Sequence, residues 1–205
     1  MVAEEIVSTC TCGSIGRSDL RQCPEHFHIF RGDRRLASVG RIVRECWPPP
    51  EKLPPADVLE NARDRGDVTD KLFGAYCLGR LTKIPRGTRQ DAVALFKKLQ
   101  DWFDAQNFKD VHVQVLLGRE DYGGVLDFRF DGVPVDLKCT YDVQQTAIMQ
   151  VAAYAALDGT NGGHILHVTE RFKEPKLVNV LGEEIKDWHT MLAHWRMIQR
   201  RTASR

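Results

Sequence analysis

Hydrophobic and polar positions recur along the chain with two periods, one typical of helices and one typical of strands. Helical spacing predicts helices over residues 56–79, after Thr88, over 144–157 and from about Glu183 onward. The apolar stripes of the second and fourth of these helices are the clearest: Ala92, Leu95, Phe96, Leu99, Trp102 and Phe103, and then Ile185, Trp188, Met191, Leu192, Trp195 and Ile198. Strand spacing predicts strands over 111–118, 164–170 and 176–182.

The order of these elements predicts the fold class. Helices alternate with single strands and with one hairpin, which favours an α/β domain whose mixed central β-sheet is flanked by helices on both faces. We expect this domain to span 51–205. We expect residues 1–50 to be an irregular N-terminal segment rich in Cys and His, joined to the domain through the extended segment WPPPEKLPP.

The segment GGVLDFRFDGVPVDLKCT, from Gly123 to Thr140, predicts a tight hairpin. Asp131-Gly132 is a strong two-residue turn signal between two strand-like runs. If Phe130 and Val133 close the turn, Asp127 falls opposite Asp136.

The hairpin register predicts two different faces, because side chains alternate along a strand. The apolar face, expected to be core, carries Leu126, Phe128, Phe130, Val133, Val135 and Leu137. The polar face carries Val125, Asp127, Arg129, Pro134, Asp136 and Lys138.

The polar face of the hairpin is a candidate metal site. Two carboxylates directly opposed on a sheet repel each other, and a divalent cation would reverse the sign of that interaction. Carboxylate oxygens are the ligands that Mg²⁺ takes, and Lys138 lies where it can orient or polarise a water. The alternative is a solvated hairpin face whose charges separate in water.

Composition narrows the function classes. The chain has 205 residues and a net charge of +1, so any affinity for nucleic acid must come from a local patch. No apolar run is long enough to span a membrane and the start shows no signal-peptide pattern, so we expect a cytoplasmic protein with reduced cysteines. No serine–histidine pair or phosphate-binding glycine loop supports a covalent hydrolase or a nucleotide triphosphatase.

The N-terminal segment contains a candidate structural zinc site. Four nitrogen and sulfur ligands are needed, and the candidates are Cys10, Cys12, Cys23, His26 and His28. Reduced thiols without a metal are the competing interpretation, and Cys46 and Cys77 are expected to be buried apolar side chains.

The helix after the hairpin adds two polar groups. Gln150 and Tyr154 are four residues apart and share one helix face. Ile148, Val151 and Ala152 belong to a different stripe, expected to be core, so Gln150 and Tyr154 are expected to point away from it.

Three motifs in this order resemble the RecB-like branch of the PD-(D/E)xK nucleases, over roughly residues 59–168. They are Gly-x-x-Asp at Gly124–Asp127, Asp-x-Lys at Asp136 and Lys138, and Gln-x-x-x-Tyr at Gln150 and Tyr154. The resemblance implies a restriction-endonuclease-like core. It also implies Mg²⁺ or Mn²⁺ on Asp127, Asp136 and the backbone carbonyl of Leu137.

The resemblance implies roles for the other motif residues too. Lys138 would position the attacking water, and Gln150 and Tyr154 would contact DNA or brace the site. Relatives often carry Gly-x-x-x-His on the first helix; here Asp70 stands at that spacing after Gly66, which makes Asp70 an additional candidate ligand. Relatives often place a glutamate on the strand before the hairpin, where Gln114 is the nearest residue here.

The predicted function is a divalent-metal-dependent DNA nuclease, most simply an exonuclease of phage recombination or DNA processing. The alternatives are an inactive nuclease-fold DNA-binding module and a nuclease subunit that needs a helicase or a single-strand annealing partner, with self-association left open. Candidate contacts to the DNA backbone are Arg63, Arg65, Arg86 and Arg89.

Overall fold

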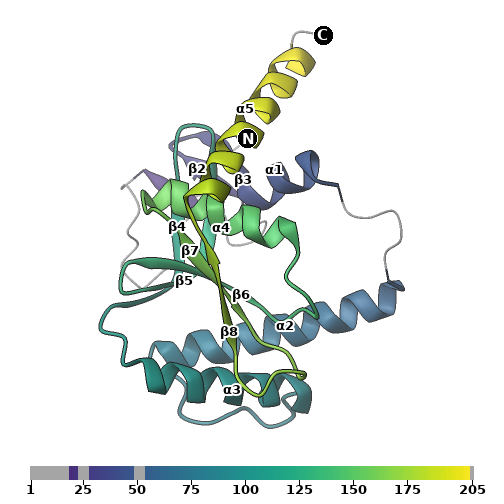
Figure 1. Ribbon diagram of the computed structural model, residues 1–205, viewed down its shortest axis with the longest axis vertical. Coiled ribbons are helices and arrows are strands. Elements are labelled where there is room, and N and C mark those ends of the chain that lie inside the picture. Colours follow the sequence, from purple (N-terminus) through teal and green to yellow (C-terminus); the bar gives the residue numbers. More distant parts are fainter. Residues whose placement is uncertain (1–18, 23–27, 49–53, 204–205) are drawn as a thin grey trace, which may run out of the picture.

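The computed structural model describes residues 19–22, 28–48 and 54–203 and has a mixed α/β fold, as predicted (Figure 1). The helices are α1 (Val39–Cys46), α2 (Ala56–Cys77), α3 (Gln90–Gln106), α4 (Gln145–Asp158) and α5 (Gly182–Ala203). The strands are β1 (Leu20–Gln22), β2 (Ile29–Arg31), β3 (Arg34–Ser38), β4 (Val111–Gly118), β5 (Tyr122–Phe130), β6 (Val133–Lys138), β7 (Gly163–His167) and β8 (Lys176–Val180).

Strand β5 is the centre of the sheet, whose order is β1-β2-β3-β5-β6-β7-β8, with β4 also paired to β5. β4 runs antiparallel along one edge of β5. The opposite edge is shared: β3 pairs in parallel with Tyr122 and Gly123, and β6 pairs antiparallel with Phe128–Phe130. Among the described strands, none pairs with the stretch between these two contacts on that edge, and this stretch contains Asp127.

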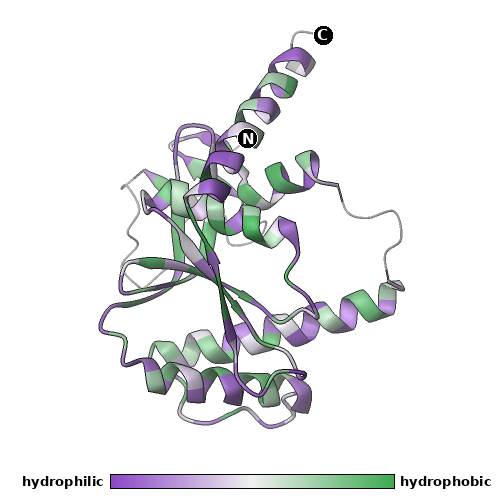
Figure 2. Ribbon diagram, viewed as in Figure 1, coloured by the Kyte–Doolittle hydropathy of each residue, from purple (hydrophilic) through white to green (hydrophobic). Residues whose placement is uncertain are grey.

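Helices cover both faces of the sheet. α2 and α3 lie side by side on one face and form a core with Phe128, Phe130, Val135 and Leu137. α1, α4 and α5 build a second core on the other face, around the fully buried Trp188. Figure 2 shows hydrophobic and hydrophilic residues alternating along α2 and α3, as expected of helices with one buried side. In the part of the chain described, no helix combines the length and apolar character needed to cross a membrane.

The prediction of an irregular segment up to residue 50 is wrong for its described residues. They form β1, β2, β3 and α1, and the sheet continues into them through the pairing of β3 with β5. Val39, Ile42 and Val43 of α1 are buried in the same core as α4 and α5. The sequence pattern indicated only the short strand-like run HFHIF, which overlaps β2, because these strands are only 3–5 residues long and only β3 joins the rest of the sheet, through its pairing with the distant β5.

The hairpin turn and register are confirmed. Asp131 and Gly132 both have positive φ, at 47° and 83°, as the turn requires. Phe130 pairs with Val133 and Phe128 with Val135. The Asp131 carboxylate fixes the turn, because it accepts hydrogen bonds from the backbone N–H groups of Lys109 and Asp110.

The predicted continuous apolar face is wrong at Leu126. Leu126 packs in the core of α1, α4 and α5, whereas Phe128 packs against α2 and α3. The same change of face occurs on β4 between Val113 and Val115, on either side of Gln114, which has φ 55°. Strict alternation fails because the backbone of β4 leaves the extended region at Gln114, opposite Asp127.

Gly66 in the middle of α2 gives a stability prediction. A Cβ at this position would meet only Cys139 Cβ, at 3.9 Å, which is ordinary van der Waals contact. Gly66→Ala is therefore expected to raise the free energy of unfolding by about 0.5–1 kcal/mol, since alanine loses less backbone entropy in a helix. Urea unfolding of the two proteins measures it, and a destabilised variant would contradict the open packing seen here.

Candidate active site

Asp127 is placed by the gap in the sheet. Pairing of β5 with β6 ends at Phe128 and Val135, one residue before Asp127 and Asp136 would pair. The backbone N–H of Leu137 instead donates a hydrogen bond to Asp127 Oδ2, at 3.0 Å. The Asp127 carboxylate thus accepts the hydrogen bond that a backbone carbonyl of β5 would accept if the β5–β6 pairing continued.

Asp136 and Lys138 form an ion pair on β6. The Lys138 ammonium lies 2.5 Å from Asp136 Oδ2, and Asp136 is only 4% exposed. Burial acts to lower the pKa of Lys138, but the carboxylates of Asp136 and Asp127 outweigh it and raise that pKa. Lys138 is therefore a fixed positive charge at neutral pH, and the alternative of a solvated hairpin face is excluded by the burial of Asp136.

α2 brings a third carboxylate to this place. Burial, with the carboxylates of Asp136 and Asp67 adding to it, raises the pKa of Asp70 to about 6. Burial also raises the pKa of Asp127 well above its usual range, again with Asp136 and Asp70 adding to the effect. Asp70, Asp127 and Asp136 therefore act on one another electrostatically, as groups that share one site do.

Tyr154 lies close to the carboxylates, but on a buried face of α4 and not on the exposed face that its helix spacing predicted. It is 8% exposed and belongs to the core of α1, α4 and α5, so the expectation that it points away from the core is wrong. α4 is buried on most of its surface, because α1, α5 and the sheet all pack on it. The nearby Asp136 and Asp127 carboxylates add to the effect of burial in raising the pKa of Tyr154.

Gly124 explains how Tyr154 approaches β5. A Cβ on Gly124 would lie 2.5 Å from Tyr154 Cε1 and 3.0 Å from its hydroxyl oxygen. Only glycine leaves room for this ring against β5 at this position. Gln150, one turn earlier on α4, is half-buried and lies beside Gly40 of α1.

The carboxylates fit a divalent cation in two respects. They are oxygen ligands, and the buried oxygen Asp70 Oδ1 has no hydrogen-bond partner. The buried Asp136 Oδ2 is paired with the Lys138 ammonium. Among residues 19–22, 28–48 and 54–203, however, no three His, Cys, Asp or Glu side chains are already arranged to hold a metal ion.

The other candidate ligands are placed differently. Cys10, Cys12, Cys23 and His26 lie outside the described residues, so the zinc prediction remains a prediction. His28 is half-buried and packs edge-on against Phe30, with ring centroids 6.5 Å apart. Cys46, Cys77 and Cys139 are free thiols. Gln114 has an exposed side chain.

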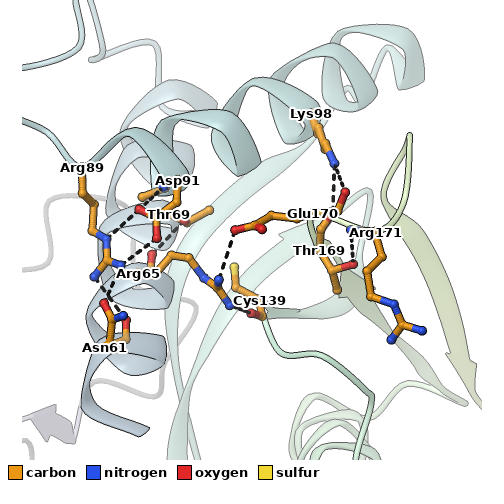
Figure 3. A network of polar contacts seen from close by, with 11 residues as sticks. Asn61, Arg65, Thr69, Arg89, Asp91, Lys98, Cys139, Thr169, Glu170 and Arg171 are labelled. Carbon is orange, nitrogen blue, oxygen red and sulfur yellow. Dashed lines mark hydrogen bonds and ion pairs between the residues drawn. The ribbon is translucent and has the colours of Figure 1, made fainter. Parts of the chain in front are cut away.

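Two of the four candidate DNA-contacting arginines already bind within the chain (Figure 3). Arg65 contacts the Cys139 carbonyl at 3.2 Å and the Glu170 carboxylate at 3.3 Å. Arg89 binds Asp91 and Asn61 and precedes the first residue of α3. The side chains of Arg63 and Arg86 are exposed.

One ion pair, between the strand that carries Asp127 and the end of α4, was not predicted from the sequence. Arg129 Nε lies 3.3 Å from Asp158 Oδ2 at the end of α4, and the Asp158 side chain is 7% exposed. Burial raises the pKa of Asp158 although Arg129 opposes it. The available signal was the four-residue spacing that places Asp158 on the same helix face as Gln150 and Tyr154.

Comparison with known proteins finds likeness only at the level of structure. No family model and no curated protein matches the chain. A phage-related exonuclease from Haemophilus somnus 129PT aligns at 11% identity and a TM-score of 0.45, over 82% of this chain and 95% of the other. An alkaline exonuclease (LHK-Exo) from Laribacter hongkongensis aligns at 12% identity and a TM-score of 0.42, over 82% and 94%.

Proposed function

We propose that this protein is a divalent-metal-dependent nuclease that hydrolyses phosphodiester bonds in DNA. The observation that carries the proposal is the group formed by Asp127, Asp136 and Lys138, with Asp70 brought beside it from α2. Asp136 is buried and Asp70 and Asp127 are half-buried, so three carboxylates held this close to one Lys138 ammonium would be costly. Their spacing in the sequence is that of the RecB-like motifs, and we assign the chain to that branch within the proposal.

The chemistry follows from the groups present. Asp127, Asp136 and Asp70, with the Leu137 carbonyl, would hold Mg²⁺ or Mn²⁺, which supplies charge neutralisation at the phosphate and a more acidic water. Lys138 adds a fixed positive charge where negative charge develops during hydrolysis. Tyr154, buried behind the carboxylates, braces β5 at Gly124.

The test is cleavage of end-labelled linear DNA, single- and double-stranded, with Mg²⁺, Mn²⁺ or EDTA. The wild type is expected to degrade DNA only with metal, and Asp136→Ala is expected to lose this degradation. Asp187→Asn is the matched control, because it removes an exposed carboxylate of α5. Products that shorten from one end would establish an exonuclease and its polarity. Cleavage in EDTA, or full activity of Asp136→Ala, would refute the proposal.

A second candidate is a DNA-binding module of nuclease fold. It is favoured by one observation: no three-ligand metal group is already arranged among the described residues. If the wild type and Asp136→Ala both bind DNA and neither cleaves it, the binding-module function is supported. Cleavage that appears only after addition of a helicase or an annealing protein would instead indicate a nuclease subunit of a larger assembly.

A further inference from the structure

An exposed aromatic ring lies three residues beyond Lys138. Tyr141 is 66% exposed, the largest exposed fraction among the described large hydrophobic side chains. Three residues of extended chain span at most about 10 Å. A group bound on this ring would therefore lie close to one bound at Lys138.

The Tyr141 ring already carries a cation on one face. The guanidinium carbon of Arg171 lies 3.8 Å from the ring centroid. Tyr141 as a whole residue is still 66% exposed with Arg171 in place on one face of its ring, so the other face is available to a ligand. Arg171 is itself half exposed, and its nearest carboxylate, that of Asp142, is 3.9 Å away.

The loop that carries Tyr141 is held at the residues before it. Arg65 donates to the carbonyl of Cys139 at 3.2 Å, and His167 Nε2 donates to the carbonyl of Thr140 at 2.7 Å. β6 and β7 are parallel, so this loop leaves the sheet at the same end as the loop that follows β7.

The loop that carries Arg171 is held just as firmly (Figure 3). Lys98 of α3 donates to three of its carbonyls, those of Thr169, Glu170 and Phe172, at 2.6–3.2 Å. The Arg171 backbone N–H donates to Thr169 Oγ1 at 3.1 Å. Both halves of the Tyr141–Arg171 pair are thus placed by the fold, which reduces the entropy lost when a ligand binds.

We infer that Tyr141 and Arg171 form a stacking platform for a base of single-stranded nucleic acid next to the scissile phosphate. A flat aromatic ring with one open face stacks on any base, and the neighbouring guanidinium adds attraction to the backbone. A paired base inside a duplex has both faces covered by its neighbours. The platform therefore selects unpaired nucleotides, and this inference rests on the proposed nuclease function.

The test compares two oligonucleotides of equal length and charge, one of thymidines and one with abasic sites. Affinities are measured by fluorescence anisotropy in EDTA, so that binding does not depend on cleavage. The wild type is expected to bind the thymidine strand more tightly than the abasic strand. Tyr141→Ala is expected to bind the thymidine strand about 5- to 150-fold more weakly than the wild type does, with its affinity for the abasic strand unchanged. Tyr141→Phe, which keeps the ring, is expected to bind as the wild type does.

Trp47→Ala is the matched control, because Trp47 is another exposed aromatic residue, 49% exposed at the end of α1. It is expected to keep the preference for bases. The inference is overturned if the wild type binds both strands equally, or if Tyr141→Ala keeps the preference. Metal-dependent cleavage without base-dependent binding would overturn the platform alone. Base-dependent binding that requires Tyr141, without cleavage, would overturn the nuclease alone.

Discussion

Asp127→Asn is expected to abolish cleavage and to stabilise the fold. Asparagine keeps the shape of the side chain, and its amide oxygen can still accept the hydrogen bond from the Leu137 N–H. It cannot replace a carboxylate as a charged metal ligand, so we expect a loss in cleavage rate on the order of a thousandfold. Stability is expected to rise by about 1 kcal/mol at pH 7, as is common when a functional site is relaxed.

The sign of the stability change follows from the pKa of Asp127. Burial, with Asp136 and Asp70 adding to it, raises that pKa in the folded state. A raised pKa means that the fold binds a proton more tightly than the unfolded chain does. The unfolding free energy of the wild type therefore falls as pH rises from about 4, the pKa of an unfolded aspartate, through the folded pKa.

Urea unfolding in EDTA at several pH values measures this effect. The advantage of Asp127→Asn is expected to be largest above the folded pKa and to vanish below about pH 3, where the carboxyl is protonated in both states. Asp187→Asn should show no such trend. A variant less stable than the wild type at pH 7 would mean that the Asp127 carboxylate is compensated by its neighbours, contrary to the electrostatics described here.

Gly124→Ala is expected to destabilise the protein by about 3 kcal/mol, a large effect for one methyl group. The new Cβ would lie 2.5 Å from Tyr154 Cε1, closer than carbon atoms approach. Tyr154 is buried among α4, α1 and the sheet and cannot swing into solvent. Either its ring or the backbone of β5 must move, and Asp127 is three residues further along that strand.

A double-mutant cycle with Tyr154→Leu isolates this contact. If the clash is the cause, Gly124→Ala should cost much less in the Tyr154→Leu background than in the wild type. Gly182→Ala is the control, because a Cβ there meets no atom within 4 Å. Equal costs in both backgrounds would show that the substitution acts on β5 itself and not through the tyrosine.

Much of the local structure could be predicted from the sequence. The bounds of α2, α4 and α5 and of β4 follow their hydrophobic periods to within a few residues. The hairpin register follows from turn chemistry, because Asp131-Gly132 admits the positive φ values that a two-residue loop needs. Within the candidate site, this local register predicted that Asp127, Asp136 and Lys138 lie on the same face of the hairpin.

What local pattern could not predict depends on contacts between distant segments. Tyr154 was expected on an exposed face because hydrophobic periodicity divides a helix into one buried and one exposed face. In the structure α4 is instead enclosed by α1, α5 and the sheet. The change of face between Leu126 and Phe128 depends on the backbone of β4 at Gln114, the residue opposite Asp127 in another strand. Neither feature has a signal within its own segment.

The sequence by itself determined which residues are candidates for the chemistry and which of them lie close along the hairpin, because turn type and side-chain alternation are local properties. Only the tertiary structure decided that β3 and β6 share one edge of β5 and leave Asp127 in the gap between them. It also decided that Asp70 of α2 comes close enough to Asp136 for the two carboxylates to act on each other electrostatically. Such pairings join segments far apart in the chain, so their free energy comes from burial and packing that exist only once the whole sheet has formed.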